Sequence, residues 1–285
     1  MGPHPRTCLV TGSTTGIGLA TAEGLARAGE HVILGARTRE RGEAARKRLA
    51  RTTGSDRVEV VVADLSVQAE VRRLADEVAT THRRLDVLVN NAGMVFSERE
   101  ETTDGIERTW ALNHLAPFLL TNLLTDLLVA SAPARVVTVS SNAHTRAHLD
   151  LDDPQFARRR YRAFAAYGQS KLANILFTIE LARRLEGTGV TANCLHPGFV
   201  RSEFGTRTNG LLRLGIGIAR PFGRTPEQGA RTSIYLATSP EVANVTGRYF
   251  VDCHPAQPRP QATDPQMARR LWELSERMTG LAPAS

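Results

Sequence analysis

Short apolar runs, rich in β-branched residues, alternate with longer helical patterns along most of this chain. These runs lack polar alternation, which indicates strands buried on both faces, as in a parallel sheet with helices on either side. Right-handed helical crossovers make such a sheet doubly wound, with three layers. The seven expected strands are 7–11, 31–36, 57–65, 85–93, 134–141, 190–198 and 247–251. The expected helices are 16–28, 39–52, 67–82, a set that ends near 131, 164–186 and 226–238.

The sequence therefore predicts a single α/β domain with a Rossmann-like, doubly wound, seven-stranded parallel sheet and helices on both faces. A length of 285 residues suits one large domain better than two. The domain is expected to span residues 1–252 and to carry its own catalytic site. Residues 253–285 are expected to form a C-terminal extension with a short helix at 264–280.

Two stretches interrupt the strand–helix alternation and are expected to wall a pocket. They are 142–162 and 199–224, and they follow the fifth and sixth strands. Ligands on a doubly wound sheet bind beyond the carboxyl ends of the strands, which is where both stretches begin. The second stretch supplies the apolar side chains Phe199, Val200, Phe204, Leu211, Leu212, Leu214 and Ile216.

Charge, hydropathy and cysteine usage argue against several classes of protein. The formal charge is +7, but the arginines are dispersed and no nucleic-acid motif accompanies them, so no nucleic-acid partner is expected. The apolar segment 113–132 contains Asp126, which a membrane span would not tolerate, and no signal peptide is visible. Cys8, Cys194 and Cys253 are odd in number and far apart, so neither a disulfide nor a metal site is expected. A cytoplasmic protein without membrane contact is predicted.

A glycine-rich turn, TGSTTGIG, follows the first strand and opens the first helix. Glycine permits positive φ and close approach of a diphosphate, while the helix N-terminus offers free N–H groups and partial positive charge. A turn in this position predicts a dinucleotide site. Its expected contacts are Gly12, Ser13, Thr15, Gly16, Ile17 and Gly18.

The end of the second strand indicates which dinucleotide binds. An NAD site commonly places Asp or Glu there, to accept a hydrogen bond from the ribose 2′-hydroxyl. This chain has no acid at Ala36 or Arg37. The guanidinium of Arg37 instead offers a fork of donors to a 2′-phosphate. The sequence thus predicts NADP(H) in preference to NAD(H).

Other strand ends are expected to border the same cofactor. Asp64 could hold the adenine amino group, or it could cap the helix that begins near Val67. Asn90 belongs first to turn chemistry and could also tie neighbouring strands together. The remaining expected contacts are Leu65, Asn91, Ala92, Gly93, Pro197, Gly198 and Val200, together with Tyr167 and Lys171.

A phenol and an ammonium lie one helical turn apart at Tyr167 and Lys171, so they share one face of their helix. A free phenol has a pKa near 10, and a neighbouring cation favours the phenolate. Ser140 and Ser141 end the strand before this helix, and a serine hydroxyl there could hold a substrate oxygen. This assembly is suited to general acid/base catalysis of carbonyl–alcohol interconversion.

These motifs together resemble the short-chain dehydrogenase/reductase family. The resemblance rests on TGSTTGIG, NNAG, Asn113 in LNHLAPFLLT, the serines of VVTVSS, YGQSK and HPG. It implies NAD(P)-dependent oxidoreduction, with Tyr167 as proton donor and acceptor and Lys171 as the binder of the nicotinamide ribose. It also implies that Ser141 orients the substrate oxygen, that Ser140 points elsewhere, and that Asn113 carries a water in a proton relay.

A narrower resemblance points to the retinol dehydrogenase-like branch and its soluble bacterial relatives. It rests on LNHLAPFLLTNLL, on YGQSKLANILFTIELARRLEGTGVTANCLHPGFVRSE and on the long interval between Ser141 and Tyr167. NADP(H) is the usual cofactor of that branch. Relatives also pair through the helices that correspond to 113–131 and 164–186, so a homo-oligomer is a possible assembly.

Two alternative functions stay open at this point. The same scaffold could reduce a C=C bond or act on a polycyclic biosynthetic intermediate. The fold could also serve as a cofactor-binding sensor without turnover, although a binding module has no need of a phenol beside an ammonium. The favoured substrate is a small carbonyl compound or alcohol of medium size and partly apolar character.

Overall fold

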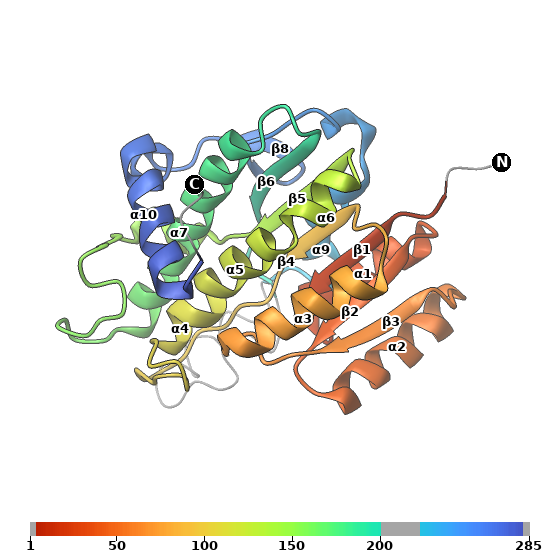
Figure 1. Ribbon diagram of the computed structural model, residues 1–285, viewed down its shortest axis with the longest axis horizontal. Coiled ribbons are helices and arrows are strands. Elements are labelled where there is room, and N and C mark those ends of the chain that lie inside the picture. Colours follow the sequence, from red (N-terminus) through yellow and green to blue (C-terminus); the bar gives the residue numbers. More distant parts are fainter. Residues whose placement is uncertain (1–3, 201–222, 282–285) are drawn as a thin grey trace.

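The computed structural model describes residues 4–200 and 223–281. Within these residues one sheet forms, in the order β3-β2-β1-β4-β5-β6-β7-β8 (Figure 1). Its strands are β1 Thr7–Thr11, β2 His31–Ala36, β3 Val58–Val62, β4 Val87–Asn90, β5 Ala134–Val139, β6 Val190–His196, β7 Tyr249–Val251 and β8 His254–Ala256. The first seven strands pair in parallel, which confirms the doubly wound α/β fold.

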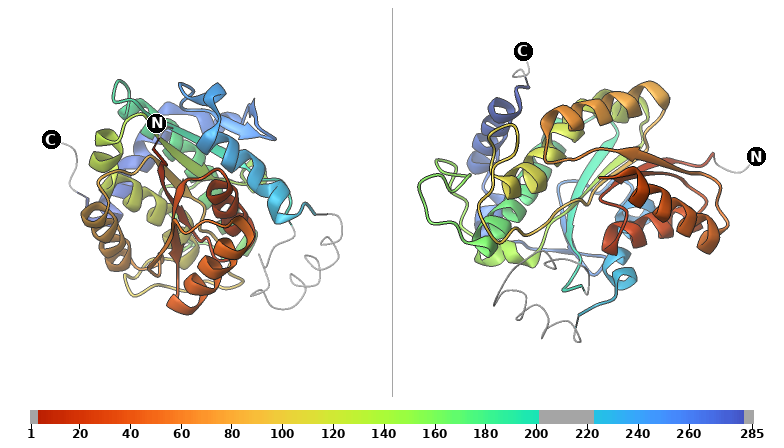
Figure 2. Two further views of the ribbon diagram at one scale, coloured as in Figure 1. Left: turned by 90° about the vertical axis from the view of Figure 1, so that its right-hand side faces the viewer. Right: turned by 90° about the horizontal axis from the view of Figure 1, so that it is seen from below.

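Helices cover both faces of this sheet (Figure 2). The α-helices are α1 Gly16–Arg27, α2 Arg39–Thr53, α3 Gln68–Thr81, α4 Arg108–Trp110, α5 Ala116–Leu123, α6 Thr125–Ala130, α7 Ala163–Arg184, α9 Pro226–Thr238 and α10 Pro265–Thr279. One apolar core lies under α1, α2 and α9, a second lies under α3, α5 and α7, and a third lies where α4, α7 and α10 meet. Burial of the central strands on both faces explains why those strands are mostly apolar.

The parallel register brings the carboxyl ends of the strands to one edge of the sheet. Thr11 lies opposite Gly35, and Asn90 lies opposite Thr138. Several strands end earlier than the sequence predicts; for example, β4 stops at Asn90 rather than at residue 93. The residues beyond each strand turn out of the ladder and form the loops of the candidate site.

The helical stretch up to residue 131 is not continuous. It consists of α4, a π-helical turn at Ala111–Leu115, α5 and α6. Leu124, which separates α5 from α6, has φ −97° and ψ 2°. The π turn includes Asn113, and π turns occur frequently at functional sites.

The C-terminal extension adds an eighth strand and a helix to the same body. Asp252 and Cys253 both have positive φ, at 50° and 65°, so they form a tight turn that sets β8 antiparallel to β7. The sequence did not predict β8 because Asp-Cys is not a usual signal for such a turn, and because β8 is three residues long and contains Pro255.

Helix α10 packs against α7, and the two lie side by side in both figures. Trp272 of α10 contacts the rings of Phe118 in α5 and Phe177 in α7, with centroid distances of 4.9 and 5.9 Å. One face of both helices is therefore already covered within the chain. Pairing through 113–131 and 164–186 stays a prediction, and it must use the faces that α10 leaves open.

Among the described residues, the helices are too short or too polar to cross a lipid bilayer.

Candidate active site

The glycine-rich turn packs so closely at Gly12 and Gly18 that these two positions leave no room for a side chain. Gly12 has φ 63°, and a Cβ there would lie 2.9 Å from the Cα of Ala92. A Cβ on Gly18 would lie 2.4 Å from the carbonyl oxygen of Gly12. Gly16 also has positive φ, at 57°. The turn therefore presents bare backbone at the start of α1, as a diphosphate requires.

Side chains from β1 and β4 fix this turn in place. The Nδ2 of Asn91 donates to the carbonyl oxygens of Thr11, at 2.8 Å, and Gly12, at 3.2 Å. The hydroxyl of Thr11 accepts from the backbone N–H groups of Asn91 and Ala92. The Nδ2 of Asn90 donates to Thr121 of α5, so within the described residues this side chain is bonded to a helix rather than to a neighbouring strand.

Ser13 and Thr15 face different surroundings within the turn. Ser13 is fully buried, and both its N–H and its hydroxyl donate to the carbonyl oxygen of Gly35. It thus anchors the turn to β2 rather than facing a ligand with its side chain. Thr15 is the exposed N-cap of α1, and its hydroxyl caps no N–H among the described residues.

The adenosine end of the expected cofactor site lies at β2 and β3. Arg37 directly follows β2 and is exposed. Asp64 accepts the N–H and the hydroxyl of Ser66 through Oδ1, at 3.0 and 2.6 Å. The N-terminus of α3 is capped from elsewhere, because Asp104 accepts from the N–H of Gln68 at 2.8 Å. Asp64 therefore holds the turn before this helix and does not cap the helix itself, and its contact with the adenine stays a prediction.

Leu65 lies between the cofactor edge and α5. It lines a small pocket together with Thr11, Ala92 and residues of α5.

The sequence gives no direct signal for the cap Asp104, because Asp104 lies in a loop 36 residues beyond its partner Gln68.

Tyr167 and Lys171 are both buried on the face of α7 that meets the end of β5, with exposed fractions of 8% and 2%. The Nζ of Lys171 lies 5.7 Å from the centre of the Tyr167 ring and donates to the carbonyl oxygen of Val139 at 2.9 Å. Ser141 makes a hydrogen bond with the Tyr167 side chain. Ser140 instead donates to the carbonyl oxygen of Lys171 at 2.7 Å.

Close contact between α7 and the turn after β5 makes this meeting possible. Gly168 follows Tyr167, and a Cβ there would lie 2.9 Å from the carbonyl oxygen of Ala143. Ser141 is the N-cap of the 3₁₀ turn Asn142–Arg146, and its Oγ accepts from the N–H of Ala143. His144 contacts the Ser141 carbonyl oxygen through Nδ1 at 2.7 Å.

Burial is the main influence on the pKa values of both groups. Desolvation raises the pKa of Tyr167 to about 12, although the hydrogen bond with Ser141 opposes this change. Desolvation also lowers the pKa of Lys171 to about 8. The lowered phenol pKa that the sequence predicts depends on Lys171 together with the positive ring of an oxidised nicotinamide, and it stays a prediction. A positive charge brought next to the phenol would be needed to lower its pKa.

Asn113 joins the NNAG loop to α7. Its Oδ1 accepts from the N–H of Met94 at 2.8 Å, and its Nδ2 donates to the Met94 carbonyl oxygen and to Ser170. Ser170 in turn donates to the Tyr167 carbonyl oxygen. The side-chain amide of Asn113 thus holds backbone and helix in position, and its part in a water relay stays a prediction.

Gly93 brings the cofactor edge and the catalytic edge together. A Cβ at this position would lie 3.1 Å from the Nζ of Lys171 and 3.2 Å from the Oδ1 of Asn113. The bare backbone of Gly93 therefore faces both side chains. With the glycine turn beside it, this arrangement fits a dinucleotide whose diphosphate lies at α1 and whose reactive ring lies near Lys171.

The loop after β6 closes the other side of the site. His196 accepts from the N–H groups of Asn142 and Gly198 through Nδ1, which links the loops after β5 and β6 across Pro197. Gly198 has φ 84°. A Cβ on Gly229 of α9 would lie 2.5 Å from Val200 and 3.3 Å from Ile17, so those two side chains lie near each other.

An ion pair that the sequence did not reveal holds the end of this loop. The Nη2 of Arg224 lies 2.9 Å from the Oδ2 of Asp252, and Nη1 contacts Oδ1. The N–H of Arg224 also donates to the carbonyl oxygen of Phe199. Phe199 and Phe164 expose 54% and 53% of their surface. The other expected wall residues, Phe204, Leu211, Leu212, Leu214 and Ile216, lie outside the described residues.

Comparison with known proteins shows the family of this chain. Residues 6–210 match the short chain dehydrogenase family. The chain belongs to that family. Its members are oxidoreductases, and this short-chain dehydrogenase is an enzyme of that class.

Its similarity to individual relatives extends over nearly the whole chain. Human retinol dehydrogenase 14 and human retinol dehydrogenase 13 are each 44% identical to it, over 98% of this chain and 87% and 86% of their own lengths. A solved structure of an uncharacterised protein from Mycobacterium paratuberculosis matches with a TM-score of 0.78 and 37% identity, over 96% of this chain and 93% of its own. The Pseudomonas aeruginosa RhlG/NADP complex matches with a TM-score of 0.68 and 32% identity, over 86% and 93%.

Proposed function

We propose that this short-chain dehydrogenase interconverts a carbonyl compound and an alcohol with NADP(H), and that Tyr167 acts as general acid and base. The observation that carries the proposal is the meeting of Ser141 and Lys171 at Tyr167, beside the bare backbone of Gly93. The names of the retinol dehydrogenases that resemble this chain support alcohol and carbonyl chemistry.

The bound dinucleotide would supply a hydride to the carbonyl carbon, or accept one from the alcohol. In the direction of reduction, Ser141 donates a hydrogen bond to the carbonyl oxygen and Tyr167 delivers its phenolic proton to the same oxygen. In the direction of oxidation, the Tyr167 phenolate takes the hydroxyl proton. Lys171 would hold the nicotinamide ribose, and its charge favours the phenolate. Asn113 keeps the Met94 backbone and α7 at a fixed separation during these steps.

The substrate proposed is a ketone, aldehyde or secondary alcohol of medium size and partly apolar character. Phe164 at the start of α7 and Phe199 after β6 are large apolar side chains exposed near the carboxyl edge of the sheet. We include a cytoplasmic location in the proposal, since Cys8, Cys194 and Cys253 are all unpaired.

A substrate panel tests this function. The protein is incubated with NADPH or NADH and a graded set of aldehydes and ketones that includes retinal, while the absorbance of the reduced nicotinamide is followed. We expect carbonyl-dependent oxidation of NADPH, with deuterium from labelled cofactor appearing on the carbinol carbon. Deuterium on the carbon of a former C=C bond, or cofactor binding without turnover on the whole panel, would contradict the proposal.

The preference for NADP(H) is tested by the substitution Arg37→Asp. A charge-assisted hydrogen bond is worth about 1.5–3 kcal/mol, so the KM for NADPH is expected to rise roughly 10- to 100-fold. The KM for NADH is expected to fall or stay constant, because the aspartate can accept from a ribose 2′-hydroxyl. The solved complexes of RhlG and of a putative gluconate 5-dehydrogenase from Beutenbergia cavernae, both with NADP, support this choice.

The matched control is Arg51→Asp, which makes the same charge change in the last turn of α2. It is expected to leave the ratio of the two KM values as in the wild type. If Arg37→Asp also left that ratio unchanged, Arg37 would not be the residue that selects the cofactor.

A further inference from the structure

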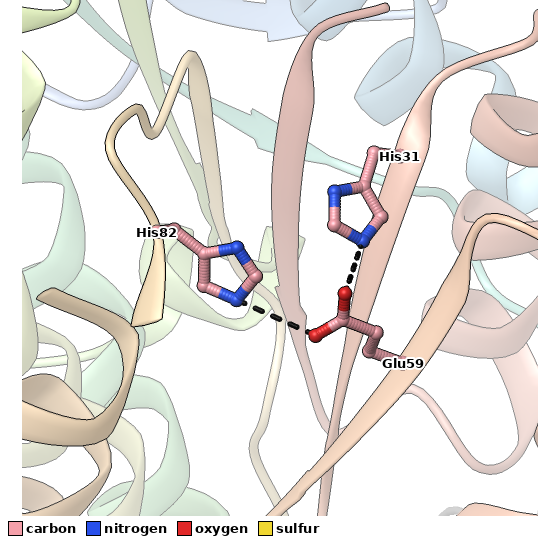
Figure 3. A group of neighbouring side chains, drawn as sticks. All are labelled: His31, Glu59 and His82. Atoms are coloured by element: carbon pink, nitrogen blue, oxygen red, sulfur yellow. Dashed lines mark ion pairs between the residues drawn. The ribbon is translucent and has the colours of Figure 1, made fainter. Parts of the chain in front are cut away.

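Two imidazoles and one carboxylate meet at the edge of the sheet opposite the catalytic groups. His31 is the first residue of β2, Glu59 is the second residue of β3, and His82 directly follows α3. These positions lie at the amino ends of β2 and β3, whereas Tyr167 and Lys171 lie beyond the carboxyl end of β5. Figure 3 shows both histidine rings pointing toward the Glu59 carboxylate from two sides.

The three side chains present their ligand atoms to one another. The Nε2 of His31 lies 2.7 Å from the Oε1 of Glu59, and the Nε2 of His82 lies 3.5 Å from its Oε2. One ligand atom from each residue lies within 4.8 Å of the other two. The two rings meet edge to face, with their centres 5.5 Å apart. One carboxylate thus stands between two imidazole nitrogens.

Regular structure holds the backbone of each of these residues. The N–H of His31 donates to the carbonyl oxygen of Arg6, and Glu59 pairs with Ile33 in the sheet. The N–H of His82 donates to the carbonyl oxygen of Val78 and so closes the last turn of α3. Only the side chains need to move when an ion enters, and fixed ligands lose little conformational entropy on binding.

Burial and charge suit a cation at this place. The His82 side chain is 10% exposed, that of His31 is 23% exposed and that of Glu59 is 48% exposed, so the cluster is open on one side. The Glu59 carboxylate supplies negative charge between two imidazole nitrogens, and zinc binds both kinds of ligand atom. Arg57 lies two residues before Glu59 and is a positive charge near the cluster. Its guanidinium donates to the backbone carbonyl oxygen of Gly29.

We propose that His31, Glu59 and His82 form a site for one divalent transition-metal ion of the zinc class. Zinc binds histidine nitrogen and carboxylate oxygen at about 2.0–2.2 Å in tetrahedral geometry, which places ligand atoms about 3.4 Å apart. Small rotations of the two rings bring the three ligand atoms to that spacing. A water takes the fourth position on the open side. The ion joins β2, β3 and the segment after α3, and it stabilises the fold without entering the reaction.

The site is tested on tag-free protein that has been stripped with a chelator and then titrated with Zn²⁺ in a calorimeter. We expect one equivalent of zinc per chain. Thermal unfolding should shift upward by roughly 5 °C when free zinc is about 100-fold above its dissociation constant. Cobalt(II) should give visible absorption bands typical of nitrogen and oxygen ligands. Oxidoreductase activity should be the same with and without the ion.

Substitutions separate this site from adventitious binding. His82→Ala and Glu59→Gln should each abolish stoichiometric zinc binding, the thermal shift and the cobalt bands. Glu59→Gln keeps the size of the side chain at a half-exposed position, so it should fold normally even if His82→Ala does not. His254→Ala, which removes an exposed histidine at β8, should bind zinc as the wild type does. The proposal would be contradicted if Glu59→Gln bound zinc as tightly as the wild type, or if the wild type bound none. The two histidines would then only form ion pairs with Glu59.

Discussion

Replacing Tyr167 by phenylalanine is expected to lower kcat for carbonyl reduction by about 10²–10⁴-fold, the contribution typical of a positioned general acid. Phenylalanine keeps the ring that is packed against α7 and the end of β5, and it removes only the hydroxyl that meets Ser141. The affinity for NADPH should stay within a small factor of the wild type, because the glycine turn and Gly93 are untouched. Steady-state kinetics with a substrate from the panel, and a cofactor titration by fluorescence, measure both quantities.

The matched control for this variant is Tyr235→Phe. Tyr235 lies on α9, and its hydroxyl donates to Glu241 on the surface. Its loss should leave kcat close to that of the wild type. A Tyr167→Phe enzyme that turned over as fast as Tyr235→Phe would show that the proton comes from another group.

The substitution Trp272→Ala is expected to lower the free energy of unfolding by about 3–5 kcal/mol, the usual effect of deleting a buried tryptophan. Trp272 is 4% exposed and packs against Phe118 and Phe177. The guanidinium of Arg184 lies 4.2 Å from its ring centre, and its indole N–H donates to Glu276. Truncation opens a cavity between α5, α7 and α10 and removes the cation–π contact. Equilibrium unfolding in urea measures the change.

An exposed aromatic residue provides the comparison. Phe164→Ala at the start of α7 should change the free energy of unfolding by no more than about 0.5 kcal/mol, as is usual for surface positions. A Trp272→Ala variant as stable as Phe164→Ala would mean that α10 contributes little to the fold. Light scattering of the Trp272→Ala variant also tests association between chains. Loosening of α10 would expose the apolar faces of α5 and α7, which would raise the scattering.

Much of the fold could be predicted because it follows from local patterns. Helix α9 begins and ends at the predicted residues, and α1 and α3 differ by one residue at their ends. Apolar periodicity indicates the bounds of these helices, whereas several strands end earlier than the sequence predicts. The break between α5 and α6, the π turn and β8 depend instead on tertiary contacts and on the backbone at Asp252 and Cys253, which sequence periodicity does not encode.

The candidate site shows the same division. Helical spacing placed Tyr167 and Lys171 on one face, and strand alternation allowed only one of Ser140 and Ser141 to face them. The opposing effect of burial, which raises the Tyr167 pKa, could not be predicted, because it depends on how much the folded chain buries the phenol. The Arg224–Asp252 pair joins residues far apart in the sequence, as does the cluster of His31, Glu59 and His82.

The pH dependence of alcohol oxidation tests the central claim most directly. Burial raises the pKa of Tyr167 to about 12, and a base with that pKa would be almost wholly protonated at neutral pH. With saturating NADP⁺, kcat/KM for the alcohol should rise with pH and level off above an apparent pKa below the ordinary phenol value of about 10. Lys171→Met removes a positive charge next to the phenolate, so it should move that apparent pKa upward. A profile that Lys171→Met leaves in place, or a rate that does not depend on pH, would contradict the role of Tyr167 as a base tuned by Lys171.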